Sequence, residues 1–253
     1  MRAKLNVFGT ISEAYGGSWR HLGEMMRLIW FPGLLYLIFS IASAFVNTES
    51  QLFLALALEV ASFLLWPIIA VAWHRFILLG DVSSSAVHFS FGRPEALFLL
   101  VSVILFLLLA PGVMIAMSAA MLPESTAAPL LSFFGLLLLL VAIYLFVRLT
   151  LLLPAAAIGS PLDPRLVLER TRGNFWRLMA VFLAVALPLV MSAILFGGLL
   201  QGGPLLQVLA VIGLALISIF FAVVNVAALS IAYRELVGTA GNEAPDPHIE
   251  PVI

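Results

Sequence analysis

The chain has 253 residues, of which 63% are hydrophobic and 10% are charged, and its formal net charge is −1. Soluble domains use roughly 45–50% apolar and about 25% charged residues, so a water-soluble globular fold is excluded for want of polar surface. The near-zero net charge alone says nothing about nucleic acid, but the basic residues are interleaved with aromatic ones in a way that favours lipid headgroups, so no nucleic-acid partner is expected. The absence of cysteine excludes disulfide and thiolate chemistry.

Residues 1–27 are predicted to form a cytoplasmic amphipathic helix that lies in the membrane interface. Apolar side chains recur at three- and four-residue steps between residues 5 and 26, and charged side chains occupy the rest of the helix surface. We expect Gly16-Gly17 to weaken or kink this helix, at roughly 1 kcal/mol per glycine. No apolar core is followed by a small-residue cleavage site, so no cleaved signal peptide is expected.

Six apolar segments follow within residues 28–237 and predict a six-helix transmembrane domain. They cover roughly residues 28–46, 51–73, 96–121, 129–150, 178–200 and 204–231. Each has about the 20 residues needed to cross a hydrocarbon core of about 30 Å. Three tight turns alternate with two longer loops. The predicted fold is therefore an all-α polytopic membrane protein, with six transmembrane helices in three hairpins plus two interfacial amphipathic helices.

The second interfacial helix is expected at about residues 163–177, between the fourth and fifth spans. Asp163 suits the N-cap, and Pro164 suits the first helical position because its missing N–H would have no helical partner there. The pattern continues to Trp176. The last segment, 238–253, contains three prolines and three acidic residues and is predicted to be a disordered cytoplasmic tail.

The positions of the basic residues predict the orientation of the spans. All twelve Lys and Arg side chains fall on the side that carries both termini and the two longer loops. The three tight turns on the other side contain none. Because positive residues near span ends are retained in the cytoplasm, we expect both termini to be cytoplasmic.

Glu59 is predicted to lie deep in the second span, about 12 Å from the outer face at 1.5 Å per residue. An ionised carboxylate at that depth costs at least several kcal/mol, so a protonated carboxyl that donates a hydrogen bond is the cheaper state. One interpretation is a structural contact with Ser40, at comparable depth on the first span. The other is a proton, cation or ligand site in a cavity opened by the prolines within the spans.

Arg148 lies near the inner end of the fourth span, a few residues before Pro154. If this span ends near residue 147, residues 149–157 form an interfacial or re-entrant stretch, and the guanidinium can reach lipid phosphates or cap helix carbonyls. Asn225 is predicted at a similar depth on the sixth span and could accept a hydrogen bond from it. We interpret Arg148 as an anchor, and a role in a transport pathway is the alternative.

Basic and aromatic side chains alternate at the predicted cytoplasmic boundary. This pattern indicates contact with anionic lipid headgroups, worth roughly 1 kcal/mol per basic residue. The candidate contacts are Arg20, Arg27, Arg75, Arg172, Arg177, Trp19 and Trp176. We expect no catalytic, metal or cofactor site, because the four histidines lack ligand spacing and no phosphate loop or nucleophile elbow occurs.

Two short motifs carry a family resemblance. Residues 147–154 (VRLTLLLP) and 171–178 (TRGNFWRL), with 166–170 before the second, resemble the YciC-like six-helix membrane proteins and the membrane domain beside some glycerophosphodiester phosphodiesterases. The resemblance implies a bacterial inner-membrane protein with a non-enzymatic role. Phosphodiesterase activity does not carry over, because that separate domain has a His-Arg-Gly motif and here His74-Arg75 is followed by Phe76.

Two functional hypotheses follow. The first is a non-enzymatic membrane module that supports envelope and lipid homeostasis or organises a partner, either another membrane protein or a second copy of the chain. The second is a transporter of a small solute or lipid-like substrate that uses Glu59 in a helix-bundle cavity. The two hypotheses differ in whether Glu59 lines a cavity or a packed interface.

Overall fold

The structure is a computed structural model that describes residues 4–81, 89–121 and 126–238. All regular secondary structure within these residues is helical. Six helices are long and apolar enough to cross a membrane, namely α2 (Leu22–Phe45), α3 (Leu52–Leu79), α4 (Arg93–Met121), α5 (Ala128–Leu149), α8 (Phe175–Gly197) and α9 (Pro204–Leu236). The chain is therefore an all-α multi-pass membrane protein, which confirms the predicted fold class. The predicted tail lies outside the described residues beyond Gly238.

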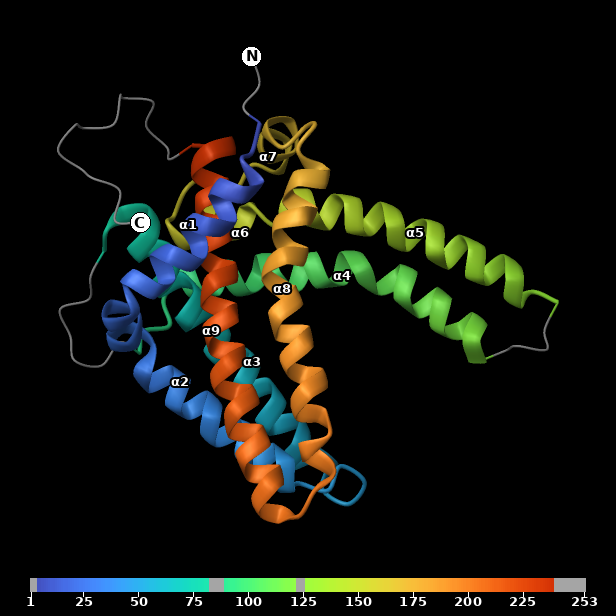
Figure 1. The fold of residues 1–253 in the computed structure, drawn as a ribbon. Helices are drawn as coiled ribbons and strands as arrows, with labels where there is room; N and C mark the ends of the chain where they lie inside the picture. Colours follow the sequence, from blue (N-terminus) through green and yellow to red (C-terminus); the bar gives the residue numbers. More distant parts are fainter. Residues whose placement is uncertain (1–3, 82–88, 122–125, 239–253) are drawn as a thin grey trace.

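The six long helices pair as α2 with α3, α4 with α5, and α8 with α9, as the spacing of the turns predicts. Figure 1 shows that α2, α3, α8 and α9 run side by side and form what we call the bundle. The α4–α5 hairpin, which we call the arm, extends away from the bundle to one side (Figure 1). The sequence predicts the hairpin but not its direction.

Close approach of two helix backbones holds the arm together. A Cβ atom on Gly112 of α4 would lie 2.8 Å from the Leu139 backbone of α5, and one on Gly135 would lie 2.8 Å from the Ala116 nitrogen. Real Cβ atoms do not tolerate such contacts, so these two positions require glycine. Small residues that let backbones approach are the usual way in which membrane helices associate without a hydrophobic driving force.

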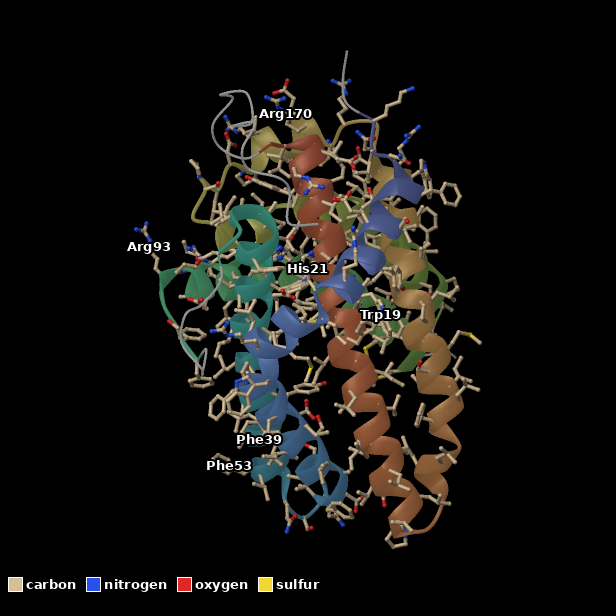
Figure 2. All side chains as sticks on the ribbon, turned by 60° about the vertical axis from the view of Figure 1, so that its left-hand side comes forward. Trp19, His21, Phe39, Phe53, Arg93 and Arg170 are labelled. Carbon is tan, nitrogen blue, oxygen red and sulfur yellow. The ribbon has the colours of Figure 1, made fainter. Side chains whose placement is uncertain are left out.

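The buried core lies at one end of the bundle, where the bundle meets the arm. Here α3 and α9 end and α8 and α4 begin, and we call this the basic end because the basic side chains gather there. The large side chains of Trp73 and Phe76 are fully buried in it. The opposite end of the bundle, with the α2–α3 and α8–α9 connections, is the turn end. There Phe53 is 86% exposed, and Figure 2 shows Phe39 and Phe53 at this end, far from Arg170.

The N-terminal helix α1 (Val7–Arg20) lies against α8 and α9 at the basic end. Its buried positions are the small residues Thr10, Ala14, Gly17 and Ser18, whereas Phe8 and Trp19 point outward with 86% and 69% of their surface exposed. A helix in water buries its large apolar side chains, so this inverted arrangement fits a helix that faces lipid.

The Gly16-Gly17 pair, which is predicted to weaken or kink the helix, does not interrupt it. Helix α1 is continuous through both glycines and ends at His21, and α2 begins directly afterwards at Leu22, six residues before the predicted span. Gly17 is buried on the side of α1 that contacts the bundle, whereas a Cβ atom on Gly16 would meet nothing within 4 Å.

The predicted second interfacial helix is shorter than expected. Asp163 caps α7 (Pro164–Arg170) as predicted, since its carboxylate accepts hydrogen bonds from the Arg165 and Leu166 nitrogens at 2.9 and 3.1 Å. The helix ends at Arg170, because the chain turns at Gly173 with a φ of 83°. Trp176 therefore belongs to the first turn of α8.

The stretch after α5, which the sequence predicts to be interfacial or re-entrant, is enclosed by other helices. It forms the short helix α6 (Leu152–Ala157), which packs against α3, α4 and α9 with most of its residues buried.

Candidate functional site

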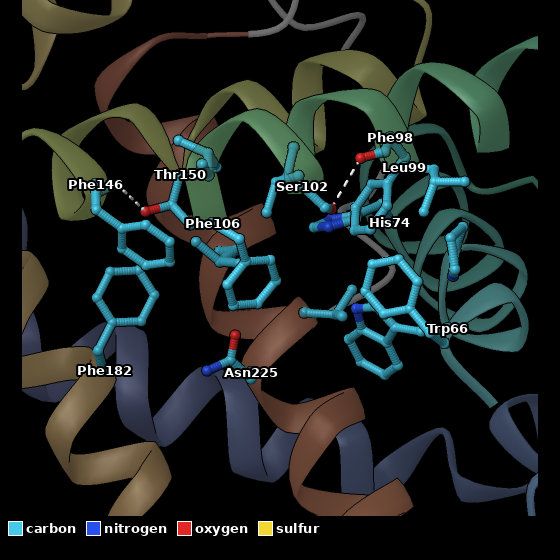
Figure 3. Close-up of a pocket in the computed structure, with 16 residues that line it drawn as sticks. Trp66, His74, Phe98, Leu99, Ser102, Phe106, Phe146, Thr150, Phe182 and Asn225 are labelled. Carbon is cyan, nitrogen blue, oxygen red and sulfur yellow. Dashed lines mark hydrogen bonds between the residues drawn. The ribbon is translucent and has the colours of Figure 1, made fainter. Parts of the chain in front are cut away.

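A cavity of about 370 Å³ lies where the arm joins the bundle, and we call it the junction cavity. Aromatic rings form much of its wall, and Figure 3 shows them around the space. These rings belong to Phe63, Trp66, Phe98, Phe106, Phe146 and Phe182. Four polar side chains interrupt the apolar wall, those of His74, Ser102, Thr150 and Asn225. An apolar cavity with a few convergent polar groups is the usual form of a small-molecule site.

A second cavity of about 440 Å³ lies within the bundle, and we call it the bundle cavity. Tyr36, Glu59, Ser62 and Ser218 contribute its polar lining. Phe63 and Trp66 line both cavities, so the two spaces adjoin at these rings. Together they run from the middle of α3 to its basic end.

Glu59 lines the bundle cavity and does not lie in a packed interface. The Ser40 hydroxyl donates to the Tyr36 carbonyl of its own helix at 2.8 Å. No hydrogen bond between Ser40 and Glu59 occurs in the described part of the chain. The predicted hydrogen bond between these two side chains is therefore not made, and the Ser40 proton is used within α2. The alternative interpretation, a site in a cavity, matches the position of Glu59.

The four prolines predicted within spans lie inside long helices, at positions 32, 67, 111 and 188 of α2, α3, α4 and α8. Pro67 lines the junction cavity, one residue from Trp66. A proline removes one backbone hydrogen bond and cannot pack like a regular turn, so it creates room beside the helix. At position 67 this room contributes to the cavity.

Arg148 is buried, with 7% of its surface exposed, and holds α7 against α5. Its guanidinium donates to Thr171 Oγ1 at 3.0 Å, to the Tyr144 hydroxyl at 2.7 Å and to the Leu168 carbonyl. It also lies over the Tyr144 ring, 5.1 Å from the centroid. The prediction that Arg148 caps helix carbonyls is borne out by Leu168 at the end of α7.

Asn225 is not the acceptor for Arg148, and this part of the prediction is wrong. The three Arg148 nitrogens already have acceptors on α5 and at the end of α7. These acceptors are the closer ones because the chain after α6 folds back over the end of α5. The Asn225 side chain instead lines the junction cavity (Figure 3).

The predicted headgroup contacts fall into two groups. Exposed side chains belong to Trp19, Arg20, Arg27, Arg172 and Trp176. The other two arginines are engaged within the protein. Arg75 forms an ion pair with Asp81 at 2.8 Å, and Arg177 donates to the Leu5 carbonyl at 2.8 Å. Arg177 therefore helps to fix the N-terminal segment on α8, a role that the sequence did not indicate.

His74 is the residue of the site that the sequence did not identify. It is fully buried, its ring lies 5.8 Å from that of Phe98, and its Nδ1 is 2.7 Å from Ser230 Oγ on α9. Its Nε2 is buried and has no hydrogen-bond partner among the described residues. One sequence signal points to His74: it is a polar residue in an apolar stretch near the end of α3.

Comparison with protein-family models, with curated proteins and with solved structures found no match. The family resemblance of residues 147–154 and 171–178 therefore stays a prediction. Within the described residues, no group of three or more His, Cys, Asp or Glu side chains could hold a metal ion. What the junction cavity offers is hydrogen bonding and apolar contact.

Proposed function

We propose that this chain is a non-enzymatic protein of the bacterial inner membrane that binds anionic lipid headgroups at its basic end and supports envelope and lipid homeostasis. Both termini lie in the cytoplasm in this proposal, because the positive-inside rule puts the basic end there. The observation that carries it is a set of exposed arginines and tryptophans, which we call the collar, formed by Trp19, Arg20 and Arg27 around the α1–α2 junction and by Arg172 and Trp176 around the start of α8.

The collar has the chemistry that a headgroup layer selects. Arg27 and Arg172 are exposed, and no hydrogen bond or ion pair with another described residue occupies either guanidinium. Guanidinium groups bind phosphate bidentately, and indole rings favour the boundary between headgroups and hydrocarbon. Each basic residue near an anionic surface contributes about 1 kcal/mol, so several together bind a headgroup layer appreciably.

The test is lipid retention by the purified full chain. We expect R20Q/R27Q/R172Q to lose most of the phosphatidylglycerol that co-purifies with the wild type in mild detergent, measured by lipid mass spectrometry. The matched control is R20K/R27K/R172K, which keeps the three charges and should retain the lipid. Equal phosphatidylglycerol content in the wild type and the glutamine variant would overturn the proposal.

A second candidate function, transfer of a lipid-like substrate, is favoured by the position of Glu59. Glu59 lines a cavity whose wall shares Phe63 and Trp66 with the junction cavity, so a carboxyl group lies close to two apolar spaces. We expect the wild type in proteoliposomes to accelerate transfer of fluorescent phosphatidylglycerol between leaflets, and E59Q to slow it and to remove its dependence on pH. Ser62→Ala, which changes the same cavity wall without a carboxyl, is the control. Transfer that is unaffected by E59Q would remove this candidate.

A further inference from the structure

Most polar groups of the junction cavity can only accept hydrogen bonds from a ligand, because their own protons are donated to groups within the protein. Ser230 has a single hydroxyl proton, which it donates to the Val226 carbonyl at 2.9 Å. Its oxygen can then only accept from His74 Nδ1, 2.7 Å away. His74 Nδ1 is therefore the protonated nitrogen of the ring.

His74 Nε2 must then carry a lone pair when the ring is neutral. Burying an ionised imidazole without a carboxylate partner is costly, and no ion pair involves His74 in the described part of the chain. The neutral ring is thus the form that this environment stabilises. A fully buried Nε2 acceptor without a partner is an unmet hydrogen bond, which costs about 1–3 kcal/mol until a donor arrives.

The two hydroxyl side chains of the cavity are acceptors too. Ser102 donates its proton to the Phe98 carbonyl at 2.8 Å, and Thr150 donates to the Phe146 carbonyl at 2.8 Å. The dashed lines in Figure 3 mark these two bonds. Donors in the lining are confined to the Asn225 amide and the Trp66 indole N–H. A ligand must therefore bring a donor for His74 and can also accept one hydrogen bond.

This pattern distinguishes between classes of ligand. A carboxylate or phosphate has no proton to donate to Nε2, and no Lys or Arg lines the cavity to balance its charge. An ammonium has the donor, but no Asp or Glu lines the cavity either. A hydroxyl group is neutral and both donates and accepts, so it satisfies His74 and one of the two donors without a buried charge.

We infer that the junction cavity binds a neutral lipid alcohol, with its hydroxyl donating to His74 Nε2 and its apolar chain against the aromatic wall. A volume of about 370 Å³ suits a single chain of moderate length. The site stands on the cavity alone and does not depend on headgroup binding at the collar.

The experiment uses the full chain in phosphatidylcholine nanodiscs and three probes of equal chain length. These are dodecan-1-ol with a photoreactive diazirine in its chain, the corresponding methyl ether and the corresponding carboxylic acid. We expect the alcohol to bind about tenfold more tightly than the ether, because the ether leaves Nε2 without a donor. Crosslinks mapped by peptide mass spectrometry should fall on α3, α4 and α9 residues of the cavity.

Three variants separate ligand recognition from a structural role. H74F keeps an aromatic ring of similar size and removes the acceptor, so the alcohol and the ether should bind equally. Ser230→Ala releases Nδ1 and lets the proton move to Nε2, so the preference for the alcohol should fall while the protein remains folded. Ser218 lines the bundle cavity and not the junction cavity, so the Ser218→Ala variant should keep the tenfold preference.

Equal binding of alcohol and ether by the wild type, a tenfold preference that survives H74F, or crosslinks confined to the outer surface would each overturn the inference. Failure of the headgroup proposal is distinguishable, since R20Q/R27Q/R172Q loses phosphatidylglycerol without altering the ratio of alcohol to ether affinity. Conversely, H74F should leave the retention of phosphatidylglycerol unchanged.

Discussion

The basic end and the turn end of the bundle are built from similar apolar residues but are stabilised in different ways. At the basic end, Trp73 and Phe76 are fully buried and stack at 4.9 Å, and His74 and Arg148 make hydrogen bonds between elements. At the turn end, large apolar side chains such as Phe53 face outward. Lipid tails are as apolar as a protein interior, so apolar contact alone does not select one arrangement there.

The difference between the two ends indicates which residues determine a unique helix packing in this chain. Burying a polar or charged side chain in hydrocarbon costs free energy, and this cost is low near the headgroup level. Polar side chains can therefore select one packing arrangement there, and they fix α1, α7 and the ends of the spans. We therefore expect the same kind of substitution to have a large effect at one end and almost none at the other.

The largest contrast is expected for aromatic truncation at the two ends. Trp73→Ala removes a fully buried ring whose Nε1 makes no hydrogen bond, so the loss is packing and the cavity left behind, about 3–5 kcal/mol of unfolding free energy. Phe53→Ala, at a side chain 86% exposed, should change it by less than about 0.5 kcal/mol. Both are measured by titration with dodecyl sulfate in mixed micelles. Similar losses for the two variants would contradict the division into two ends.

A smaller effect is expected at Arg148. Arg148→Met leaves the Leu168 carbonyl and the Tyr144 hydroxyl without their charged donor, which should cost about 2–3 kcal/mol. Loss of this anchor should also expose α7 to protease before the bundle unfolds. Arg165→Met, at an exposed position in the first turn of α7, is the control and should leave the digestion rate unchanged. Protection of α7 in both variants would show that Arg148 is not the anchor.

The smallest of the three effects concerns the arm. Gly112→Ala puts a Cβ atom 2.8 Å from the Leu139 backbone, so α4 and α5 must separate, at about 1–3 kcal/mol. Gly197→Ala has open space around the new methyl group and serves as the matched control. A pair of spin labels across the arm should report a longer distance in Gly112→Ala alone. An unchanged distance would mean that the glycine contact does not set the arm.

The sequence predicted the fold class and the helix pairs because hydropathy and turn spacing are local properties. The N-cap at Asp163 is likewise predictable from the sequence, since the backbone N–H groups that donate to its carboxylate lie two and three residues away. The direction of the arm was not, because glycines at positions 112 and 135 reveal a close contact only once the facing helix is known. The role of His74 is not predictable from the sequence either, because its hydrogen-bond partner Ser230 lies 156 residues away in the chain.

Helix α9 has 33 residues, so at 1.5 Å per residue it is about 50 Å long and exceeds a hydrocarbon core of about 30 Å. Its last third is surrounded by α1, α3 and α6 and not by acyl chains. In a thicker or thinner bilayer, α9 therefore keeps the same protein neighbours, and α2, α3 and α8 must absorb the mismatch by tilting. Membrane thickness would thereby be converted into relative movement of the helices that line both cavities.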